Sequence, residues 1–381
     1  MGKKCKLSEL CDVRDGTHDS PEYVQEGYPL VTSKNIVDGR LDLTVVNYIS
    51  EKDYHHINER SKVDLGDIIM PMIGTIGNPH LIEAIPEFAI KNVALIKFPK
   101  SDVSNKFIYY FLQSDAFKTY VAENNRGGTQ KFLSLKDIRN MDIPALSYEK
   151  QLEICAVLDK VSELISLRKE QLAKLDQLVK SRFIELFGDP ETNPNGLIKV
   201  LLSDIAEYFN GLTYSPDNVT TDGTVVLRSS NIQNNQLDFT DTVRVDCPIK
   251  EKLYVKNNDI LMCSRNGSAR LVGKVALIKN LFEPMTFGAF MMIIRSKYYP
   301  YLMTYFQMDA FRRQIATGAT TTINQITGNM LNKISLPLPN TVDINEFAVF
   351  VEQTDKSKLA IQQSLDKLEL LKKSLMQEYF G

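Results

Sequence analysis

The chain has 381 residues, 43% of them hydrophobic and 24% charged, so it is long enough for two or three folded units with apolar cores. With 45 basic and 47 acidic residues its formal net charge is −2, and it lacks the basic surplus of a protein that grips nucleic acid unaided. No apolar run approaches the roughly 20 residues that cross a bilayer, and the first residues lack the apolar stretch of a signal peptide, so we expect no membrane association.

The first part of the chain mixes strand and helix signals. Residues 66–73 and 93–98 are short apolar runs rich in β-forming residues, and Gly, Pro and Asn turn signals separate such runs. Residues 105–121 form an aromatic-rich helical segment, and residues 298–315 form a similar one later in the chain. We therefore expect α+β domains with substantial β-sheet.

Two long helices follow the two mixed regions. The boundaries predicted from the sequence are a globular domain at 1–145, a helix at 146–188, a second globular domain with its entry linker at 189–338, and a helix at 339–381. Pro144 and Pro337 precede the helices, and Asp343 with Glu346 has the spacing of a capping box. Gly188, followed by Asp189-Pro190, predicts the end of the first helix.

Each long helix carries an apolar stripe with a heptad-like spacing. The members of the two stripes are Leu158, Val161, Ile165, Leu172, Leu175, Val179 and Leu186, and then Val351, Ile361, Leu365, Leu368 and Leu375. Polar residues interrupt both stripes, at Arg168 and Arg182 in the first and at Thr354, Lys358 and Lys372 in the second, in positions that do not correspond. We expect the helices to pair with each other as an antiparallel coiled coil, the alternative being ordinary packing of each helix.

An internal repeat relates the two halves of the chain. Leu7-Ser8-Glu9-Leu10 matches Leu202-Ser203-Asp204-Ile205, and Gly16 with Ser20-Pro21 matches Gly211 with Ser215-Pro216. Further collinear matches join 30–36 to 226–232, Asp67-Ile68-Ile69-Met70 to Asp259-Ile260-Leu261-Met262, and Asp115-Ala116-Phe117 to Asp309-Ala310-Phe311. From Pro144 to Gly188 the offset is constant at 193 residues. Duplication predicts two similar domains related by a pseudo-twofold axis.

The length of the helices sets a distance. A helix from Glu149 to Leu186 has 38 residues and spans roughly 57 Å at about 1.5 Å per residue. Along B-DNA, at about 3.4 Å per step, this corresponds to some 17 base pairs. Two similar domains held at a fixed separation are typical of proteins that recognise a two-part DNA site.

Signatures of catalysis or metal binding are missing from the sequence. There is no Asn/Asp-Pro-Pro-aromatic motif for a flipped adenine, no Gly-x-Gly-x-x-Gly and no Walker loop. The five cysteines include no Cys-x-x-Cys pair, and the four histidines form no i, i+4 pair. We expect a cytoplasmic protein that binds no metal and is not itself an enzyme.

The chain resembles the specificity subunits of type I restriction–modification systems along essentially its whole length. The resemblance rests on the order and duplication of several motifs. They are Leu7-Ser8-Glu9-Leu10 with Gly16 and Ser20-Pro21, Thr32-Ser33-Lys34-Asn35-Ile36, Asp67-Ile68-Ile69-Met70, Gly127-Gly128-Thr129-Gln130, and the helix exit Phe183-Ile184-Glu185-Leu186-Phe187-Gly188-Asp189-Pro190.

The resemblance implies a function and a set of partners. A subunit of this kind binds double-stranded DNA and two methyltransferase subunits, which methylate adenine N6 with S-adenosylmethionine. Two motor-nuclease restriction subunits, which use ATP and Mg²⁺, complete the complex. Each globular domain then reads one half of a split site and the helices set the gap, while the chain itself binds no cofactor. The alternative from another class is a coiled-coil scaffold that does not bind DNA.

Candidate DNA-binding residues are those whose side chains suit base edges or phosphates and that stand among small residues. In the first domain they are Lys34, Asn35, Thr75, Arg126, Thr129, Gln130 and Lys131. In the second domain they are Arg228, Ser230, Asn231, Arg265, Asn266, Ser268, Arg270, Thr320, Thr321, Thr322 and Asn324. Of these, the loop from Arg265 to Arg270 is favoured most.

Some candidates have an equally good structural interpretation. Asn35 and Asn231 recur in both copies, so they are as well explained as residues that hold a turn. His18 is either a phosphate contact or an ordinary loop histidine. The aromatic residues at 109–111 and 305–306 have helical spacing, which favours core positions over base stacking.

Overall fold

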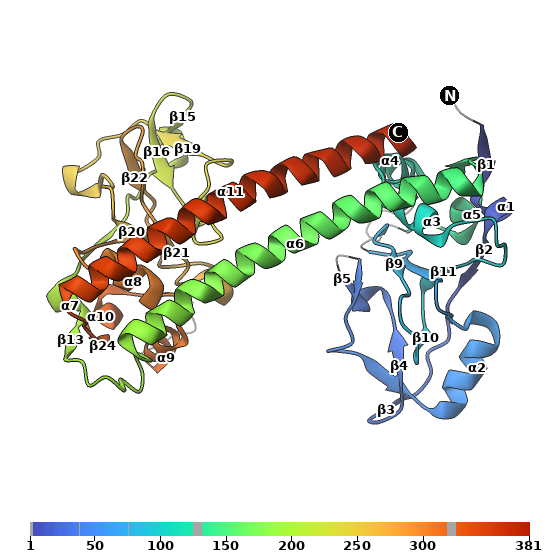
Figure 1. Cartoon of the computed structure of the whole chain (residues 1–381), viewed down its shortest axis with the longest axis horizontal. Coiled ribbons are helices and arrows are strands. Elements are labelled where there is room, and N and C mark those ends of the chain that lie inside the picture. The colour runs from blue at the N-terminus through green and yellow to red at the C-terminus, as the bar shows by residue number, and fades with distance from the viewer. Residues whose placement is uncertain (1–2, 38, 75, 125–131, 318–324) are drawn as a thin grey trace. The chain divides into compact units, whose positions relative to one another are not determined.

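The computed structural model describes residues 3–37, 39–74, 76–124, 132–317 and 325–381 (Figure 1). The chain divides into two compact units, and both long helices are shared between them. Unit 1 comprises Met1–Lys169 and Gln363–Gly381, and unit 2 comprises Glu170–Gln362. Both ends of the chain therefore belong to unit 1, which takes the first part of one helix and the last part of the other. The predicted α+β class is confirmed.

The long helices are α6 (Tyr148–Phe187) and α11 (Thr341–Phe380). Gly188 ends α6 as predicted, because it adopts a positive φ of 78° and its N–H donates to the carbonyl of Ile184. The predicted cap of α11 is wrong: Asn340 Oδ1 accepts from Asp343 N at 3.0 Å, and Glu346 pairs with Arg182 instead. The shift arises because α11 begins two residues before Asp343, so that Asn340 occupies the capping position.

In unit 1 the described residues form two four-stranded sheets, two two-stranded sheets and short helices. One sheet has the order β2-β11-β8-β9 and is antiparallel, and the other has the order β10-β4-β7-β3 with β10 parallel to β4. The strands are β1 (Lys4–Lys6), β2 (Asp12–Asp15), β3 (Tyr23–Val24), β4 (Tyr28–Val31), β5 (Ile36–Val37), β6 (Arg40–Leu41), β7 (Asn47–Ile49), β8 (Ile68–Pro71), β9 (His80–Leu81), β10 (Ala89–Ile90), β11 (Val93–Lys97) and β12 (Asp142–Pro144). The helices are α1 (Leu7–Leu10), η1 (Ser33–Asn35), α2 (Glu51–Ser61), α3 (Asn105–Phe111), α4 (Asp115–Asn124) and α5 (Leu135–Arg139).

Unit 2 repeats this topology strand for strand, which confirms the duplication read from the sequence. Its sheets have the orders β14-β23-β20-β21 and β15-β19-β16-β22, with β22 parallel to β16. The strands are β13 (Lys199–Leu201), β14 (Glu207–Asn210), β15 (Val219–Thr220), β16 (Thr224–Leu227), β17 (Ile232–Gln233), β18 (Gln236–Leu237), β19 (Val243–Val245), β20 (Ile260–Cys263), β21 (Val275–Leu277), β22 (Met285–Phe287), β23 (Met291–Arg295) and β24 (Ser335–Pro337). The helices are α7 (Leu202–Ile205), η2 (Pro216–Asn218), η3 (Ser229–Asn231), η4 (Glu251–Leu253), η5 (Ala269–Leu271), α8 (Tyr299–Tyr305), α9 (Asp309–Thr317) and α10 (Gly328–Leu331). The main difference is α2, whose place in unit 2 is taken by the shorter η4.

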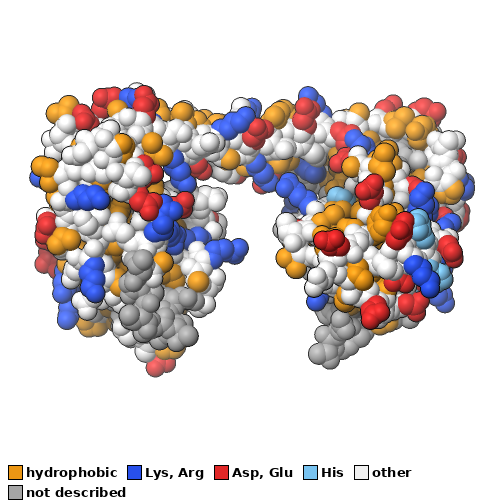
Figure 2. All heavy atoms as spheres, turned by 90° about the horizontal axis from the view of Figure 1, so that it is seen from below, with side chains coloured by type: hydrophobic (Ala, Val, Ile, Leu, Met, Phe, Trp, Pro, Cys, Tyr) orange, Lys and Arg blue, Asp and Glu red, His pale blue; other side chains and the backbone are white. Residues whose placement is uncertain are grey.

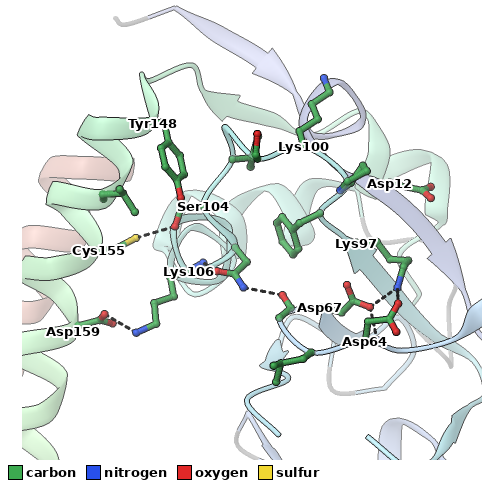
Figure 3. A pocket seen from close by; sticks show the side chains of 18 of the residues that line it. Asp12, Asp64, Asp67, Lys97, Lys100, Ser104, Lys106, Tyr148, Cys155 and Asp159 are labelled. Carbon is green, nitrogen blue, oxygen red and sulfur yellow. Dashed lines mark hydrogen bonds and ion pairs between the residues drawn. The ribbon is translucent and has the colours of Figure 1, made fainter. Parts of the chain in front are cut away.

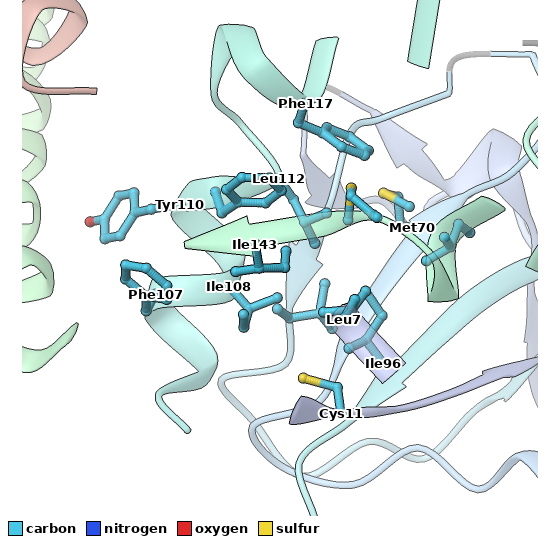
Figure 4. Close-up of a cluster of buried hydrophobic side chains, with 14 of the residues drawn as sticks. Leu7, Cys11, Met70, Ile96, Phe107, Ile108, Tyr110, Leu112, Phe117 and Ile143 are labelled. Atoms are coloured by element: carbon cyan, nitrogen blue, oxygen red, sulfur yellow. The ribbon is translucent and has the colours of Figure 1, made fainter. Parts of the chain in front are cut away.

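The central sheet of each unit is buried on both faces, which explains why its strands are continuous apolar runs. Side chains alternate between the two faces of a strand. In β11, Ala94 and Ile96 therefore face the core that the helices cover, shown in Figure 4, whereas Val93 and Leu95 face the second sheet. The same alternation holds in β20 and β23 of unit 2. Each domain is thus a stack of sheet, sheet and helices.

Within each unit, the parts of α6 and α11 run antiparallel. In unit 2, Asp176 and Arg182 on α6 pair with Lys358 and Glu346 on α11, at 2.6 and 2.7 Å. In unit 1, the first turns of α6 share a core with Phe380 at the end of α11, and further along α6 Lys169 pairs with Glu369 at 2.8 Å. The predicted antiparallel pairing is confirmed inside each unit.

The predicted stripe residues all lie at the buried or half-buried side of the helices. None of the twelve is exposed; the most buried are Leu158, Val161, Val179 and Leu365. Three interruptions of the stripes meet polar partners on the other long helix: Arg168 donates to Ser364 Oγ at 3.2 Å, Arg182 pairs with Glu346, and Lys358 pairs with Asp176.

The aromatic-rich helical segments are each broken into two helices. The segment predicted at 105–121 forms α3 and α4, and the segment at 298–315 forms α8 and α9. In unit 1 the break lies at Ser114, whose Oγ accepts from the N–H of Phe117 and so satisfies the new helix start. The break turns both Phe111 and Phe117 into the core.

The glycines that open the two copies permit a close crossing of strands. A Cβ on Gly16 would overlap the carbonyl oxygen of Ile90, and a Cβ on Gly211 would overlap those of Phe287 and Gly288. Backbone atoms cannot yield as a flexible side chain can, so both positions require glycine.

We predict that Gly211→Ala destabilises the chain by about 1–3 kcal/mol, as expected for an overpacked site, when urea unfolding is followed by circular dichroism. Gly267→Ala is the matched control, because a Cβ there meets nothing within 4 Å. Equal unfolding midpoints for the two variants would contradict the close-approach argument.

Candidate nucleic-acid interface

Three segments of unit 2 meet at one end of β20, and two of them carry residues that were predicted from the sequence to contact DNA. They are the residues around η3, the loop 264–274 between β20 and β21, and the turn before β23. Asn266 Nδ2 donates to Ser229 Oγ at 3.3 Å, which ties the loop to η3. The backbone N–H groups of Ser264 and Arg265 donate to the carbonyl of Phe290 at 2.9 and 3.1 Å.

Arg265 is the best-positioned cation of this cluster. Its guanidinium lies over the ring of Phe290, 5.4 Å from the ring centroid. Both side chains are exposed, Phe290 by 59%. An aromatic face limits the freedom of the guanidinium and leaves its N–H groups available to a ligand. Nothing in the sequence singles out Phe290, because an isolated aromatic residue after Gly-Ala carries no motif.

The other unit 2 candidates differ in accessibility. Ser268 and Arg270 are exposed on the same loop, and the N–H of Ser268 donates to Asn266 Oδ1 at 3.0 Å. Arg228 is half-buried and pairs with Asp241 at 2.8 Å. Ser230 Oγ and Arg228 Nε are buried atoms without a hydrogen-bond partner among the described residues. The candidates Thr320, Thr321, Thr322 and Asn324 lie outside the described residues.

In unit 1, the equivalent end of β8 has a different chemistry. Ile73 occupies the position of Arg265. The backbone of Ile73 forms an isolated antiparallel β-bridge with Phe132, just as that of Arg265 does with Gln325. Lys34 is exposed on η1, where its N–H donates to the hydroxyl of Thr32. The candidates Thr75, Arg126, Thr129, Gln130 and Lys131 lie outside the described residues.

Asn35 and Asn231 are not placed to contact DNA, so their prediction as DNA-binding residues is wrong. The side chains are 5% and 1% exposed. Each Nδ2 donates to two backbone carbonyls, those of Asp42 and Val45 in unit 1 and the equivalent pair in unit 2, at 2.8–3.1 Å. Each Oδ1 accepts the N–H three residues earlier. The amide is fully used in holding the loop, which is the structural alternative that the sequence left open.

His18 belongs to a polar cluster near the same end of unit 1. Its Nδ1 lies 2.8 Å from Asn92 Oδ1 and its Nε2 lies 2.7 Å from Asp15 Oδ2. Asp15 also pairs with Arg60 on α2. The hydrogen bonds to Asn92 and Asp15 raise the pKa of His18 above its usual value. The ring remains largely exposed, so a protonated imidazole here is accessible to an anion.

A pocket of about 730 Å³ lies in unit 1 between α6 and the loops that flank β8 and β11 (Figure 3). None of the residues selected from the sequence lines it. Lys97 pairs with Asp64 and Asp67 at 2.9 and 2.5 Å, and Lys106 pairs with Asp159 on α6 at 2.7 Å. Burial raises the pKa of Asp67, and the nearby Lys97 opposes that rise.

These ion pairs attach elements to one another rather than forming a reactive centre. Unit 2 has an equivalent of the Asp67–Lys97 ion pair, formed by Asp259 and Arg295 at 2.6 Å. The described lining of the pocket contains no histidine, and burial raises the pKa of the Cys155 thiol, so an activated nucleophile is not assembled there.

The described residues contain neither a metal centre nor a membrane-spanning helix. No group of three or more His, Cys, Asp or Glu residues there is arranged to hold a metal ion. None of the helices described is long and apolar enough to span a membrane. All five cysteines are free. The aromatic residues Tyr110, Phe111, Tyr305 and Phe306 are buried, which confirms that they are core residues rather than stacking platforms.

The chain matches a family model twice. The model of the type I restriction modification DNA specificity domain matches residues 3–177 and 195–376. The two matches follow the two copies of the repeat, each running from the first strand of a copy into its long helix.

Individual relatives are distant in sequence. The EcoBI specificity subunit of Escherichia coli is 27% identical over 169 residues, which cover 43% of this chain and 35% of that protein. The EcoKI specificity subunit of Escherichia coli K12 is 25% identical over 284 residues, which cover 68% and 59%. The matched part thus spans less than two thirds of these relatives. The S subunit structure from M. genitalium covers 100% of this chain and 96% of its own, with a TM-score of 0.57 and 15% identity, and so shares the fold.

We predict that His18 titrates with a pKa above 6.5 in NMR spectra of the folded chain. Asn92→Gly removes the acceptor at a residue with a φ of 55°, which glycine accepts, and lowers the pKa. Because the folded pKa is the raised one, the contribution of His18 to the free energy of unfolding is complete below pH 6.5 and is lost as pH rises through the folded pKa.

Asn280→Gly, at a φ of 52°, is the matched backbone control and leaves the titration unchanged. A pKa of His18 that does not respond to Asn92→Gly would disprove the assigned cause.

Proposed function

Because the chain belongs to the family of the type I restriction modification DNA specificity domain and carries two copies of that domain, we propose that it is the sequence-specific DNA-recognition subunit of a type I restriction–modification complex. Each globular domain reads one half of a bipartite site. The paired helices set the gap between the halves and provide the docking surface for two adenine-N6 methyltransferase subunits.

One observation carries the two-reader mechanism: the two domains share a framework but differ in side-chain chemistry at equivalent positions. At the end of the third strand of the central sheet, unit 2 has Arg265 and unit 1 has Ile73. At the 3-10 turn held by the buried asparagines, unit 1 has Lys34 and unit 2 has Ser230. Arg265 is exposed, and arginine suits guanine. Ile73 is half-buried and packs against the core of unit 1, so unit 1 does not present the same contact. Two domains with the same backbone framework and different side chains at equivalent positions suit two half-sites of different sequence.

The chemistry is assigned to partners. In this proposal the methyltransferase subunits use S-adenosylmethionine, two restriction subunits use ATP and Mg²⁺, and this chain binds none of these cofactors and performs no catalytic step. Partners that close around the DNA also supply basic surface, which accounts for a net charge of only −2 in the reader. The complex is placed in the cytoplasm, where five free thiols stay reduced. The scaffold alternative has no support from the relatives, which are named specificity subunits.

The test is to purify the chain with its methyltransferase subunits and map the methylated adenines on genomic DNA. The expected result is one two-part sequence with a fixed gap. Methylation without sequence preference, or a single undivided motif, would refute the proposal.

We predict that Arg265→Ala relaxes the choice of base at one position of one half-site, at a cost of about 1–3 kcal/mol in discrimination. Phe290→Leu, which removes the cation–π contact, has a smaller effect in the same half-site. Arg265→Lys is the control, since it keeps the charge but not the forked geometry, so overall affinity persists while discrimination falls. Competition binding with half-site variants measures all three, and changes in both half-sites would contradict the assignment.

We predict that inserting four residues after Leu172 in α6 lengthens the gap of the recognised site and leaves both half-sites unchanged. Four helical residues add about 6 Å, equivalent to roughly two base pairs. Methylation mapping gives the gap directly. Altered half-sites with an unchanged gap would count against the spacer role of the helices.

A further inference from the structure

Lys372 stands where the repeat has an apolar residue. It interrupts the apolar stripe of α11, and its equivalent in the other copy, 193 residues earlier, is Val179. Val179 is 8% exposed and belongs to the core of unit 2. Lys372 is half-buried, and its ammonium lies 5.8 Å from the centroid of the Tyr110 ring. Since valine satisfies the packing in one copy, packing alone does not explain a lysine in the other.

Lys372 lines a pocket of about 310 Å³ inside unit 1, between α4, α6 and α11. The charged residues of the lining are four lysines and two carboxylates, namely Lys118, Lys169, Lys372, Lys373, Asp115 and Glu369. Two of the lysines are matched, Lys118 by Asp115 and Lys169 by Glu369, each at 2.8 Å. In the described part of unit 1, Lys372 and Lys373 form no ion pair. With four lysines and two carboxylates, the lining of the pocket has a surplus of two positive charges.

The surroundings of Lys372 disfavour its charge. Burial lowers the pKa of Lys372, the ammonium of Lys169 lowers it further, and Asp159 opposes both. Asp159 is already engaged, since it accepts from Lys106 and from the hydroxyl of Tyr110 at 2.7 Å. The other interrupting lysine, Lys358, has an ion pair with Asp176 at 2.6 Å. Lys372 is the interrupting lysine whose charge has no such partner among the described residues.

α4 links this pocket to the candidate interface of unit 1. Its first turn supplies Asp115 and Lys118 to the pocket. The adjacent Phe117 lies beneath the loop that follows β8, where a Cβ on Gly77 would be 3.2 Å from the Phe117 ring. Figure 2 shows Lys and Arg side chains gathered where the long helices meet the globular part that carries the histidines, all four of which belong to unit 1.

We propose that the α4–α6–α11 pocket of unit 1 is a phosphate-binding site, and that its occupant in the complex is a phosphodiester group of the DNA backbone. A compact ammonium is a suitable point charge for a phosphate oxygen. An anion in the pocket neutralises Lys372 and Lys373 together and offsets the cost of burying the former. The identity of the occupant rests on the proposed DNA-reading function, whereas the phosphate chemistry rests on the pocket alone.

The test compares the salt dependence of DNA binding by the full chain with its methyltransferase subunits. The variants are Lys372→Val, which installs the residue of the other copy, and the exposed Lys373→Met. Lys180→Met is the matched control, because Lys180 is the repeat equivalent of Lys373 and is exposed in unit 2. Each lost phosphate contact reduces the slope of log affinity against log salt by about 0.9. Circular dichroism melting verifies that each variant folds.

A second readout is lysine reactivity. Reductive methylation followed by mass spectrometry measures the modification of Lys372 in the free complex, with target DNA and with inorganic phosphate. We expect DNA to protect Lys372 at least tenfold, and the slope to become shallower for Lys372→Val and Lys373→Met but not for Lys180→Met, with half-site preference unchanged.

Several results would overturn the inference, and they are distinguishable. Selective DNA binding with unchanged slopes and an unprotected Lys372 rejects the site while the proposed function survives. Protection by inorganic phosphate but not by DNA rejects the phosphodiester and leaves a site for free phosphate. Absence of any selective DNA binding by the wild-type complex refutes the proposed function, and the DNA assignment of the pocket is then rejected with it.

Discussion

The structure depends on the insertion of aromatic residues at the ends of the long helices into the cores of the globular parts. In unit 2, Phe183 and Phe187 on α6 pack with Phe347 on α11 and with Tyr301, with ring centroids 4.8–5.7 Å apart. In unit 1, Phe380 on α11 packs against α3. Such pairs add to the apolar area they bury. Because the helix ends are part of each core, a globular part and its helices form one cooperative unit rather than a domain on a tether.

Polar interruptions in the helix stripes have separate roles in the two units. In unit 2, Arg182 and Lys358 form ion pairs between α6 and α11, with Glu346 and Asp176, which favours one antiparallel register over others. In unit 1 an interrupting lysine faces a pocket with surplus positive charge. The same kind of departure from a heptad pattern therefore specifies pairing in one place and offers a ligand site in another, and only the partners of each side chain distinguish the two.

The helices, strands and internal repeat could be predicted well from the sequence, whereas the roles of loop residues in the two domains could not. Duplication and heptad spacing are periodic signals, so the repeat, both long helices and the buried strands followed from them. The break at Ser114 was missed because helical spacing continues across it and only tertiary packing turns Phe117 inward. Asn35 was ambiguous because an amide suits adenine and a turn equally well. Phe290 was missed because its significance comes from Arg265, a residue distant in sequence. The role of a loop side chain depends on what folds against it, which no local pattern encodes.

The hydrogen bonds by which Asn35 and Asn231 each hold a loop have an evolutionary consequence. Each amide fixes the course of its loop through backbone groups alone, using no neighbouring side chain apart from the Thr32 hydroxyl. Lys34, which is exposed beside the Asn35 amide, is therefore free to mutate without loss of the loop conformation, whereas the hydroxyl of Ser230 is buried. A change in an exposed residue of this kind costs the fold little free energy, so the two halves of the chain can diverge in surface chemistry while they keep the same strand topology.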